Sequence, residues 1–108
     1  MRVQQMNFVN LIGQITNEPQ IILTEDGRKI AKFALSTKEM YLDEKGNTKE
    51  IKNWHRVTAW GKWVPILEQL CQKGQSIAIE GRLRSKFFSM NGYKNAITEI
   101  EINDLVIL

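Results

Sequence analysis

The first half of the chain alternates apolar and polar residues with the period of two that is typical of β-strands. This pattern predicts strands over residues 8–15, 29–37 and 54–60. A kinked extension over residues 18–23 leads from the first strand to a hairpin turn at Asp26-Gly27. Between the second and third strands the charges of residues 38–53 cancel, and we interpret this polar segment as a solvated loop.

The period changes after the third strand. Apolar residues then recur at the helical spacing i, i+3, i+4 and i+7, which predicts a short amphipathic helix over residues 62–73 with Gly74 as its C-terminal cap. Its apolar side consists of Trp63, Ile66, Leu67 and Leu70. Residues 76–90 and 93–102 again show the pattern of strands, and the dipeptide Asn91-Gly92 predicts a tight hairpin turn between them.

This order of elements predicts the fold class. Three strands, one helix and a two-stranded hairpin give an all-β protein of the OB-fold type, a five-stranded Greek-key barrel with one short helix between the third and fourth strands. Gly13 and Gly81 would permit the sharp bends or close backbone contacts that a small barrel needs. Because 108 residues accommodate one core, we expect a single domain over residues 1–108.

The composition excludes several classes of protein. With 43% hydrophobic and 25% charged residues, the chain lies in the globular range. It has neither an apolar run of the ~20 residues that a membrane span requires nor a targeting segment. The single cysteine, Cys71, cannot form an internal disulfide, and one histidine leaves no ligand set for structural zinc. We therefore expect a protein of a reducing compartment such as the cytoplasm, with no metal and no membrane partner.

The net charge of +3 is concentrated in one segment. Residues 76–94 contain Arg82, Arg84, Lys86 and Lys94 against Glu80, and the charges of the rest of the chain cancel. The period of two places three of these cations on one face of the predicted strand, together with Phe88. The opposite face, which we interpret as the core face, holds Ile77, Ile79, Gly81, Leu83 and Phe87.

Aromatic and cationic residues also share a face of the strand at residues 54–60. Trp54, Arg56, Thr58 and Trp60 alternate there with His55, Val57 and Ala59. A single-stranded nucleic acid needs cations and stacking surfaces side by side, because it offers an anionic backbone and exposed bases. Taken singly, each aromatic residue could instead belong to the core, and each cation to a solvated or edge-guarding strand face.

Together these faces predict a nucleic-acid site. The stacking residues would be Trp54, Trp60 and Phe88, with a further surface from Met40 or Tyr41, of which we favour Tyr41. The residues that bind phosphate would be Lys32, Arg56, Arg82, Arg84 and Lys86. No nucleophile or metal ligand accompanies His55, and no phosphate-binding glycine motif appears. We therefore predict that the protein is not an enzyme and needs no cofactor.

Three segments carry a resemblance to a known family: WHRVTAWGK at residues 54–62, KG at 73–74 and IEGRLR at 79–84. With MNFVNLIG at residues 6–13, they resemble the bacterial and mitochondrial single-stranded DNA-binding proteins over nearly the whole chain. The resemblance implies an OB-fold subunit that wraps single-stranded DNA without sequence preference in replication, recombination and repair. It further implies a location in the bacterial cytoplasm, in association with the nucleoid. It also implies that Trp54, Trp60 and Phe88 match base-stacking positions and that His55 lies at a subunit interface.

The first predicted strand favours association with a second copy. It is rich in Val9, Leu11, Ile12 and Ile15, and no lysine guards its edge. The resemblance implies a homotetramer. We therefore expect a homo-oligomer, a tetramer, with the face of His55, Val57 and Ala59 in its interface.

The two ends of the chain differ from the family pattern. Residues 1–5 are expected to form an N-terminal extension before the first strand. Family members usually continue into an acidic tip that recruits repair and replication proteins, whereas this sequence stops at Leu108, so tail-mediated partners are not expected. The alternative function is that of a tailless primosomal type of OB-fold module for protein assembly.

Overall fold

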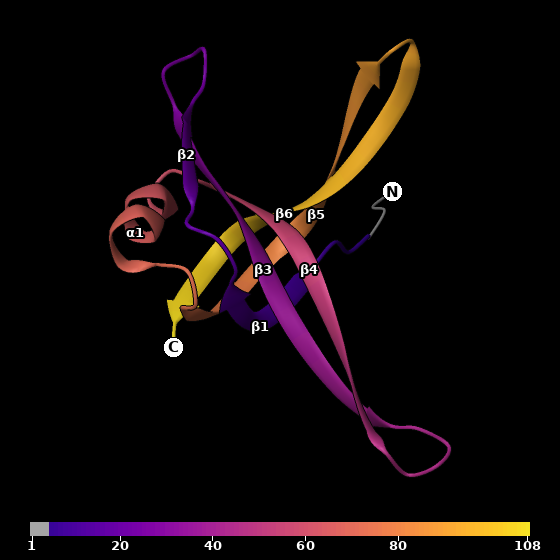
Figure 1. Ribbon diagram of the computed structural model, residues 1–108. Coiled ribbons are helices and arrows are strands. Elements are labelled where there is room, and N and C mark those ends of the chain that lie inside the picture. Colours follow the sequence, from indigo (N-terminus) through magenta and orange to yellow (C-terminus); the bar gives the residue numbers. More distant parts are fainter. Residues whose placement is uncertain (1–4) are drawn as a thin grey trace.

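The computed structural model describes residues 5–108, so the extension expected over residues 1–5 lies, except for Gln5, outside the described residues. Its elements, in chain order, are β1 (Val9–Ile15), β2 (Gln20–Leu23), β3 (Lys29–Leu42), β4 (Thr48–Trp60), α1 (Trp63–Leu70), β5 (Ser76–Met90) and β6 (Tyr93–Ile107) (Figure 1). The helix lies between β4 and β5, as the sequence predicts.

Five of the strands close into a barrel. The sheet runs β1-β5-β6-β4-β3-β2, and β1 also pairs with β3 through Gln14–Ser36 and Ile15–Leu35, which closes the ring. Among the strands of residues 5–108, only β4 and β6 run parallel, over the two pairs Val57–Ile100 and Thr58–Glu101. The extension predicted over residues 18–23 contains a separate short strand, β2, which pairs with β3 outside the ring. The predicted OB-fold barrel is confirmed.

The core fills the barrel and continues beneath α1. Its most deeply buried side chains are Ile15, Leu35, Val57, Leu67, Cys71 and Ile77. Val57 and Ala59 belong to this core, so the prediction that they lie in a subunit interface is wrong. The close backbone contacts predicted at two glycines are confirmed, since a Cβ at Gly13 would lie 2.1 Å from the carbonyl oxygen of Ser36 and one at Gly81 2.2 Å from that of Glu101.

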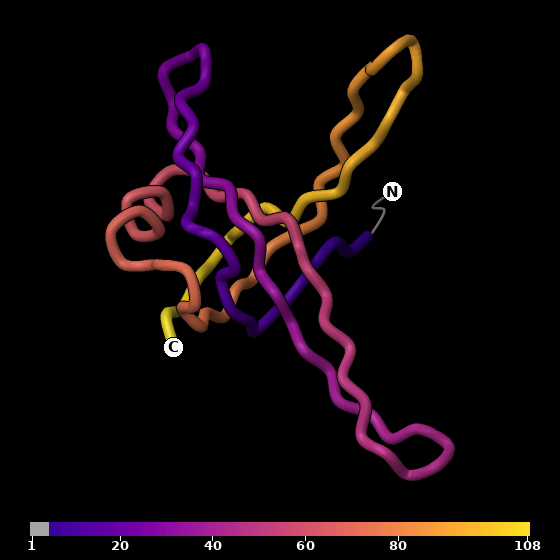
Figure 2. The backbone as a smooth tube through the Cα atoms, viewed as in Figure 1, coloured from indigo at the N-terminus to yellow at the C-terminus, as the bar shows by residue number. Residues whose placement is uncertain are grey.

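Two long hairpins leave the barrel and diverge (Figures 1 and 2). The β3–β4 arm comprises residues 38–53, and the β5–β6 arm comprises residues 82–97. The loop predicted over residues 38–53 is therefore wrong, because β3 and β4 stay paired from Lys38–Lys52 to Leu42–Thr48. Both faces of this arm meet solvent, so its sequence lacks the alternation that marks a half-buried strand.

The predicted core face of β5 is wrong at two residues for a related reason. Leu83 is half-exposed and Phe87 is 78% exposed, because both lie beyond Gly81, where the hairpin leaves the ring. Two boundaries also differ. The helix ends at Leu70, with Cys71 in extended conformation as its C-cap, and Gly74 instead donates its N–H to the carbonyl of Ile15. Within residues 5–108, no helix is both long enough and apolar enough to cross a membrane.

Candidate nucleic-acid interface

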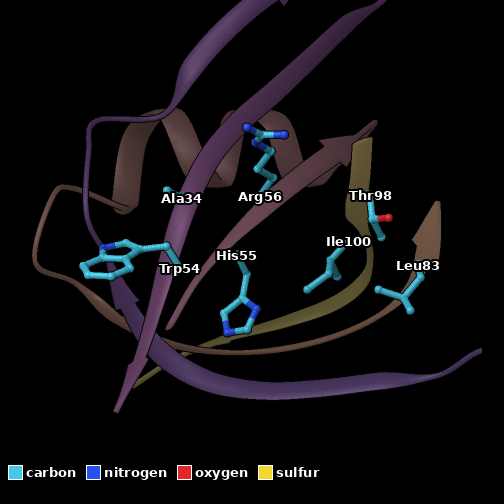
Figure 3. Close-up of a pocket in the computed structure, with 7 residues that line it drawn as sticks. All are labelled: Ala34, Trp54, His55, Arg56, Leu83, Thr98 and Ile100. Atoms are coloured by element: carbon cyan, nitrogen blue, oxygen red, sulfur yellow. The ribbon is translucent and has the colours of Figure 1, made fainter. Parts of the chain in front are cut away.

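Two adjoining pockets lie where the two arms diverge. The larger, of about 550 Å³, is lined by Ala34, Trp54, His55, Arg56, Leu83, Thr98 and Ile100 (Figure 3). The second, of about 380 Å³, is lined by Asn17, Gln20, Lys32, Phe33, Ala34, Arg56, Val57, Thr58 and Glu99. Because Ala34 and Arg56 belong to both, we treat the pockets as one depression and call it the fork groove.

An exposed aromatic ring lines the fork groove and has a cation on either side of it along β4. Trp54 is 62% exposed, so it is not a core residue. The Lys52 Nζ lies 5.4 Å from the centroid of its indole ring, within the range of a cation–π contact. Arg56, two residues further along β4, is exposed and has no ion-pair partner within residues 5–108. The alternation of β4 thus produces a stacking surface with a cation on either side.

Trp60 is half-buried at the end of β4 and belongs to a different place. It lines a pocket of about 380 Å³ with Val64 and Pro65 of α1, and the Arg28 guanidinium lies 5.3 Å from its ring centroid. Asp26 holds Arg28 through contacts of 2.7 and 2.8 Å. Hydrogen bonds from Thr24 and Arg28 lower the pKa of Asp26 to about 2. A cation therefore already lies over this indole.

The other two predicted stacking residues lie far out on the arms. Phe88 is partly exposed on the β5–β6 arm, in a pocket of about 440 Å³ with Phe87, Ser89 and Lys94. Tyr41 is half-exposed on the β3–β4 arm. The structure thus distributes the four predicted stacking residues over four places, and only Trp54 faces the fork groove.

The predicted phosphate-binding cations, except Arg56, are engaged in ion pairs. Arg82 Nη2 lies 3.1 Å from Glu101 Oε1, and Arg84 Nε lies 3.1 Å from Glu101 Oε2. Lys32 Nζ lies 3.2 Å from Glu99 Oε1, and Lys86 Nζ lies 3.1 Å from Glu99 Oε2. The outer face of the barrel therefore carries alternating charges where the sequence suggested a purely cationic strip.

Glu99 is the buried centre of this network. It also accepts a hydrogen bond of 2.7 Å from Thr58 Oγ1, which explains why Thr58 is buried although it shares a strand face with Trp54. Burial alone would raise the pKa of Glu99, but the hydrogen bonds from Thr58, Lys86 and Lys32 outweigh it and lower the pKa to about 2. Glu99 therefore joins β3, β4, β5 and β6 through one ionised carboxylate.

His55 lines the fork groove from the root of the β3–β4 arm. The imidazole is half-buried, and its Nε2 lies 2.9 Å from Thr37 Oγ1 on the neighbouring strand. Figure 3 shows its ring leaving β4 in a different direction from Trp54. One strand segment thus turns Trp54 outward and His55 toward the junction of the arms.

Sequence reasoning missed four residues of this site: Arg28, Lys52, Glu99 and Glu101. A signal for the two carboxylates is present in the predicted turn, because a hairpin at Asn91-Gly92 places Glu99 opposite Arg84 and Glu101 opposite Arg82. Lys52 could have been found by extending the alternation of β4 one step before Trp54. Arg28 had no such signal, since it lies beyond the strand pairs.

The closed five-stranded barrel with its inserted helix places the protein in the OB-fold class, whose barrels commonly bind oligonucleotides or oligosaccharides. The family model of the single-strand binding protein family matches residues 6–108. The chain therefore belongs to the single-strand binding protein family, and the resemblance seen in the sequence is confirmed.

Individual relatives agree with this assignment. The chain is 39% identical over 105 residues to single-stranded DNA-binding protein 1 of Chlorobaculum tepidum, covering 95% of this chain and 65% of that protein. It is 36% identical over 104 residues to the single-stranded DNA-binding protein of Xylella fastidiosa, covering 95% of this chain and 63% of that protein. The chain thus spans less than two thirds of the length of these relatives.

Two solved structures share the fold. The single-strand binding protein of Plasmodium falciparum in complex with single-stranded DNA superposes with a TM-score of 0.89 at 30% identity, covering 100% of this chain and 99% of that one. A deletion mutant of the single-stranded DNA binding protein from Thermus aquaticus superposes with a TM-score of 0.84 at 30% identity, covering 95% of this chain and 50% of that one.

Proposed function

We propose that this protein binds single-stranded DNA without sequence preference and coats the strand during replication, recombination and repair in the bacterial cytoplasm, without catalysing a reaction. The observation that carries the proposal is the exposed Trp54 ring between Lys52 and Arg56 at the fork groove. The names of the relatives and the DNA in the Plasmodium falciparum complex support it.

Stacking and charge would act together along the strand. A base stacks on Trp54, and Lys52 and Arg56 attract the neighbouring phosphates. Because every base has a flat face, such stacking discriminates little between sequences. Tyr41 and Phe88 on the arms and Trp60 beneath Arg28 are the further proposed stacking positions, and Lys32, Arg82, Arg84 and Lys86 the further phosphate-binding residues.

Tryptophan fluorescence and anisotropy test the proposal. Titration with oligo-dT should quench the emission, and Trp54→Ala should weaken binding of a labelled oligo-dT by ~1–3 kcal/mol without loss of thermal stability. Trp60→Ala should weaken binding within the same range. The matched control is Trp63→Phe on α1, which should bind normally. Neither quenching nor binding by the wild type would instead favour the protein-assembly module.

Salt dependence separates the phosphate contacts from the stacking. For a single strand, each neutralised phosphate contributes a slope of about 0.7 to log affinity against log salt. Arg56→Gln should flatten this slope, because Arg56 is exposed and free of an ion-pair partner within residues 5–108. An unchanged slope would place the phosphate contacts elsewhere.

We further propose that the protein is a homo-oligomer, a tetramer, with His55 near an interface. From Val9 to Gly13, β1 pairs with β5 only, so its other edge has no strand partner in the described part of the chain. Ile12 on the outward face of β1 is 69% exposed. Sedimentation of the wild type and His55→Lys at micromolar concentration tests this, and a wild type that sediments as a 12.5 kDa monomer would contradict it.

A further inference from the structure

The two carboxylates of the outer barrel face are held in different ways. The side chain of Glu99 is 5% exposed and is fixed by a hydroxyl and two ammonium groups. The side chain of Glu101 is 22% exposed, and among residues 5–108 only Arg82 and Arg84 donate to its carboxylate. These two arginine side chains are themselves 45% and 53% exposed. Glu101 is therefore the more easily exchanged partner.

The contacts of Glu101 are of the kind that a phosphate makes. Each of its oxygens accepts one guanidinium at 3.1 Å, so one anion bridges two arginines. Guanidinium groups bind phosphate oxygens with the same donor geometry. An ion pair between partly exposed side chains contributes little free energy, so a phosphate can displace the carboxylate. The displaced carboxylate then remains beside the phosphate and repels it.

We propose that Glu101 competes with the phosphates of single-stranded DNA for Arg82 and Arg84. In the free protein its carboxylate pairs with both arginines, and the free energy needed to release them lowers the affinity for the strand. The inference rests on the proposed function, because it assigns the two arginines to the phosphates of the bound strand. Glu101 is thus a positioning residue that keeps both guanidinium groups on the outer face of β5. Glu99 does not exchange, because it is buried and held by Thr58.

Neutral variants of the carboxylate test the inference. We expect Glu101→Gln to lower the Kd for labelled oligo-dT roughly 2- to 30-fold, the range expected for two partly exposed ion pairs. The charge-matched control is Glu68→Gln, on an exposed position of α1 away from the barrel strands of the site. In a protein that already carries Arg82→Gln and Arg84→Gln, the gain in affinity for oligo-dT from Glu101→Gln should fall to the gain that Glu68→Gln produces. Glu101→Thr, a second neutral variant with good strand propensity, should reproduce the gain.

The outcomes distinguish this inference from the proposed function. If the wild type does not bind oligo-dT at any salt concentration, the proposed function fails, and the inference fails with it. If the wild type binds and both neutral variants bind no more tightly than Glu68→Gln, the inference alone is overturned. It is also overturned if the gain persists without the two arginines, because the effect would then arise from net charge.

Discussion

The barrel and its two arms are built from the same strands, yet they differ in what surrounds them. β3, β4, β5 and β6 each begin or end in the barrel and continue into an arm. The pairing of β3 with β4 is continuous, and that of β5 with β6 resumes after one register shift between Glu80 and Gly81. Within the barrel, side chains such as Leu35 and Ile77 are completely buried. Residues 82–96 of the β5–β6 arm are all exposed. The hydrogen-bonded ladder is therefore common to both regions, and apolar burial is not.

This difference separates stability from binding surface. A two-stranded hairpin alone is marginally stable in water, so the arms depend on the barrel that anchors them. The barrel in turn buries the apolar residues that point into its interior. Most of the exposed aromatic side chains, including Tyr41, Phe87 and Tyr93, lie on the arms. We infer that the barrel maintains the fold, while the arms and their roots present the surface that we propose for single-stranded DNA.

The largest expected effect comes from truncating a buried side chain that contacts the barrel. Leu67→Ala should lower the free energy of unfolding by about 2–5 kcal/mol, because Leu67 is fully buried on α1. Phe87→Ala on the β5–β6 arm removes a larger side chain but should change the free energy of unfolding by less than about 0.5 kcal/mol. Urea denaturation at equal protein concentration measures both. A comparable loss for Phe87→Ala would mean that this arm is packed in solution.

A smaller effect is expected at Glu99, where barrel and arms meet. The pKa of Glu99 is lowered from 4.5 to about 2 in the folded protein, so the carboxylate stabilises the fold above pH 4.5. This contribution, at most about 3 kcal/mol, should be lost as the pH falls from 4.5 towards 2. Glu99→Gln should remove that part of the acid dependence, measured by urea denaturation at each pH.

The matched control for this titration is Glu68→Gln, which should keep the full acid-dependent loss of stability. Asp26, whose pKa is also lowered, is present in every variant and cancels in the comparison. If the free energy of unfolding of Glu99→Gln fell with pH as steeply as that of the wild type, the ion pairs of Glu99 with Lys32 and Lys86 would contribute nothing to the stability of the fold.

The regions that could be predicted from the sequence follow this division. β5 has the predicted bounds Ser76–Met90, and the turn at Asn91-Gly92 lies where the dipeptide indicates. In the barrel, one buried face imposes a period of two, and close packing requires glycine at Gly13 and Gly81. Neither constraint acts on the β3–β4 arm, where lysines and acidic residues occupy both faces. Its pairing therefore left no periodic signal and was interpreted as a loop.

The candidate site was predicted less well, because it depends on contacts between strands. Counting charges along residues 76–94 gave a basic segment, but Glu99 and Glu101 on the returning strand pair with three of its four cations, Arg82, Arg84 and Lys86. Trp54 and Trp60 share one face in the pattern of β4. They nevertheless line different pockets, because the barrel turns the end of β4 towards α1.

The smallest expected effect is confined to the tip of the β5–β6 arm. Asn91 and Gly92 have φ of 52° and 79°, the left-handed pair that a tight hairpin turn requires. Gly92→Ala should cost about 1 kcal/mol, because a side chain at this φ is strained. Since residues 82–96 of this arm are all exposed, amide hydrogen exchange should accelerate about fivefold within residues 82–97 and stay unchanged in the barrel. Asn91→Gly, which keeps this φ accessible, is the matched control and should leave exchange nearly unaltered. A fall in the thermal unfolding midpoint as large as that of Leu67→Ala would show that arm and barrel unfold as one unit.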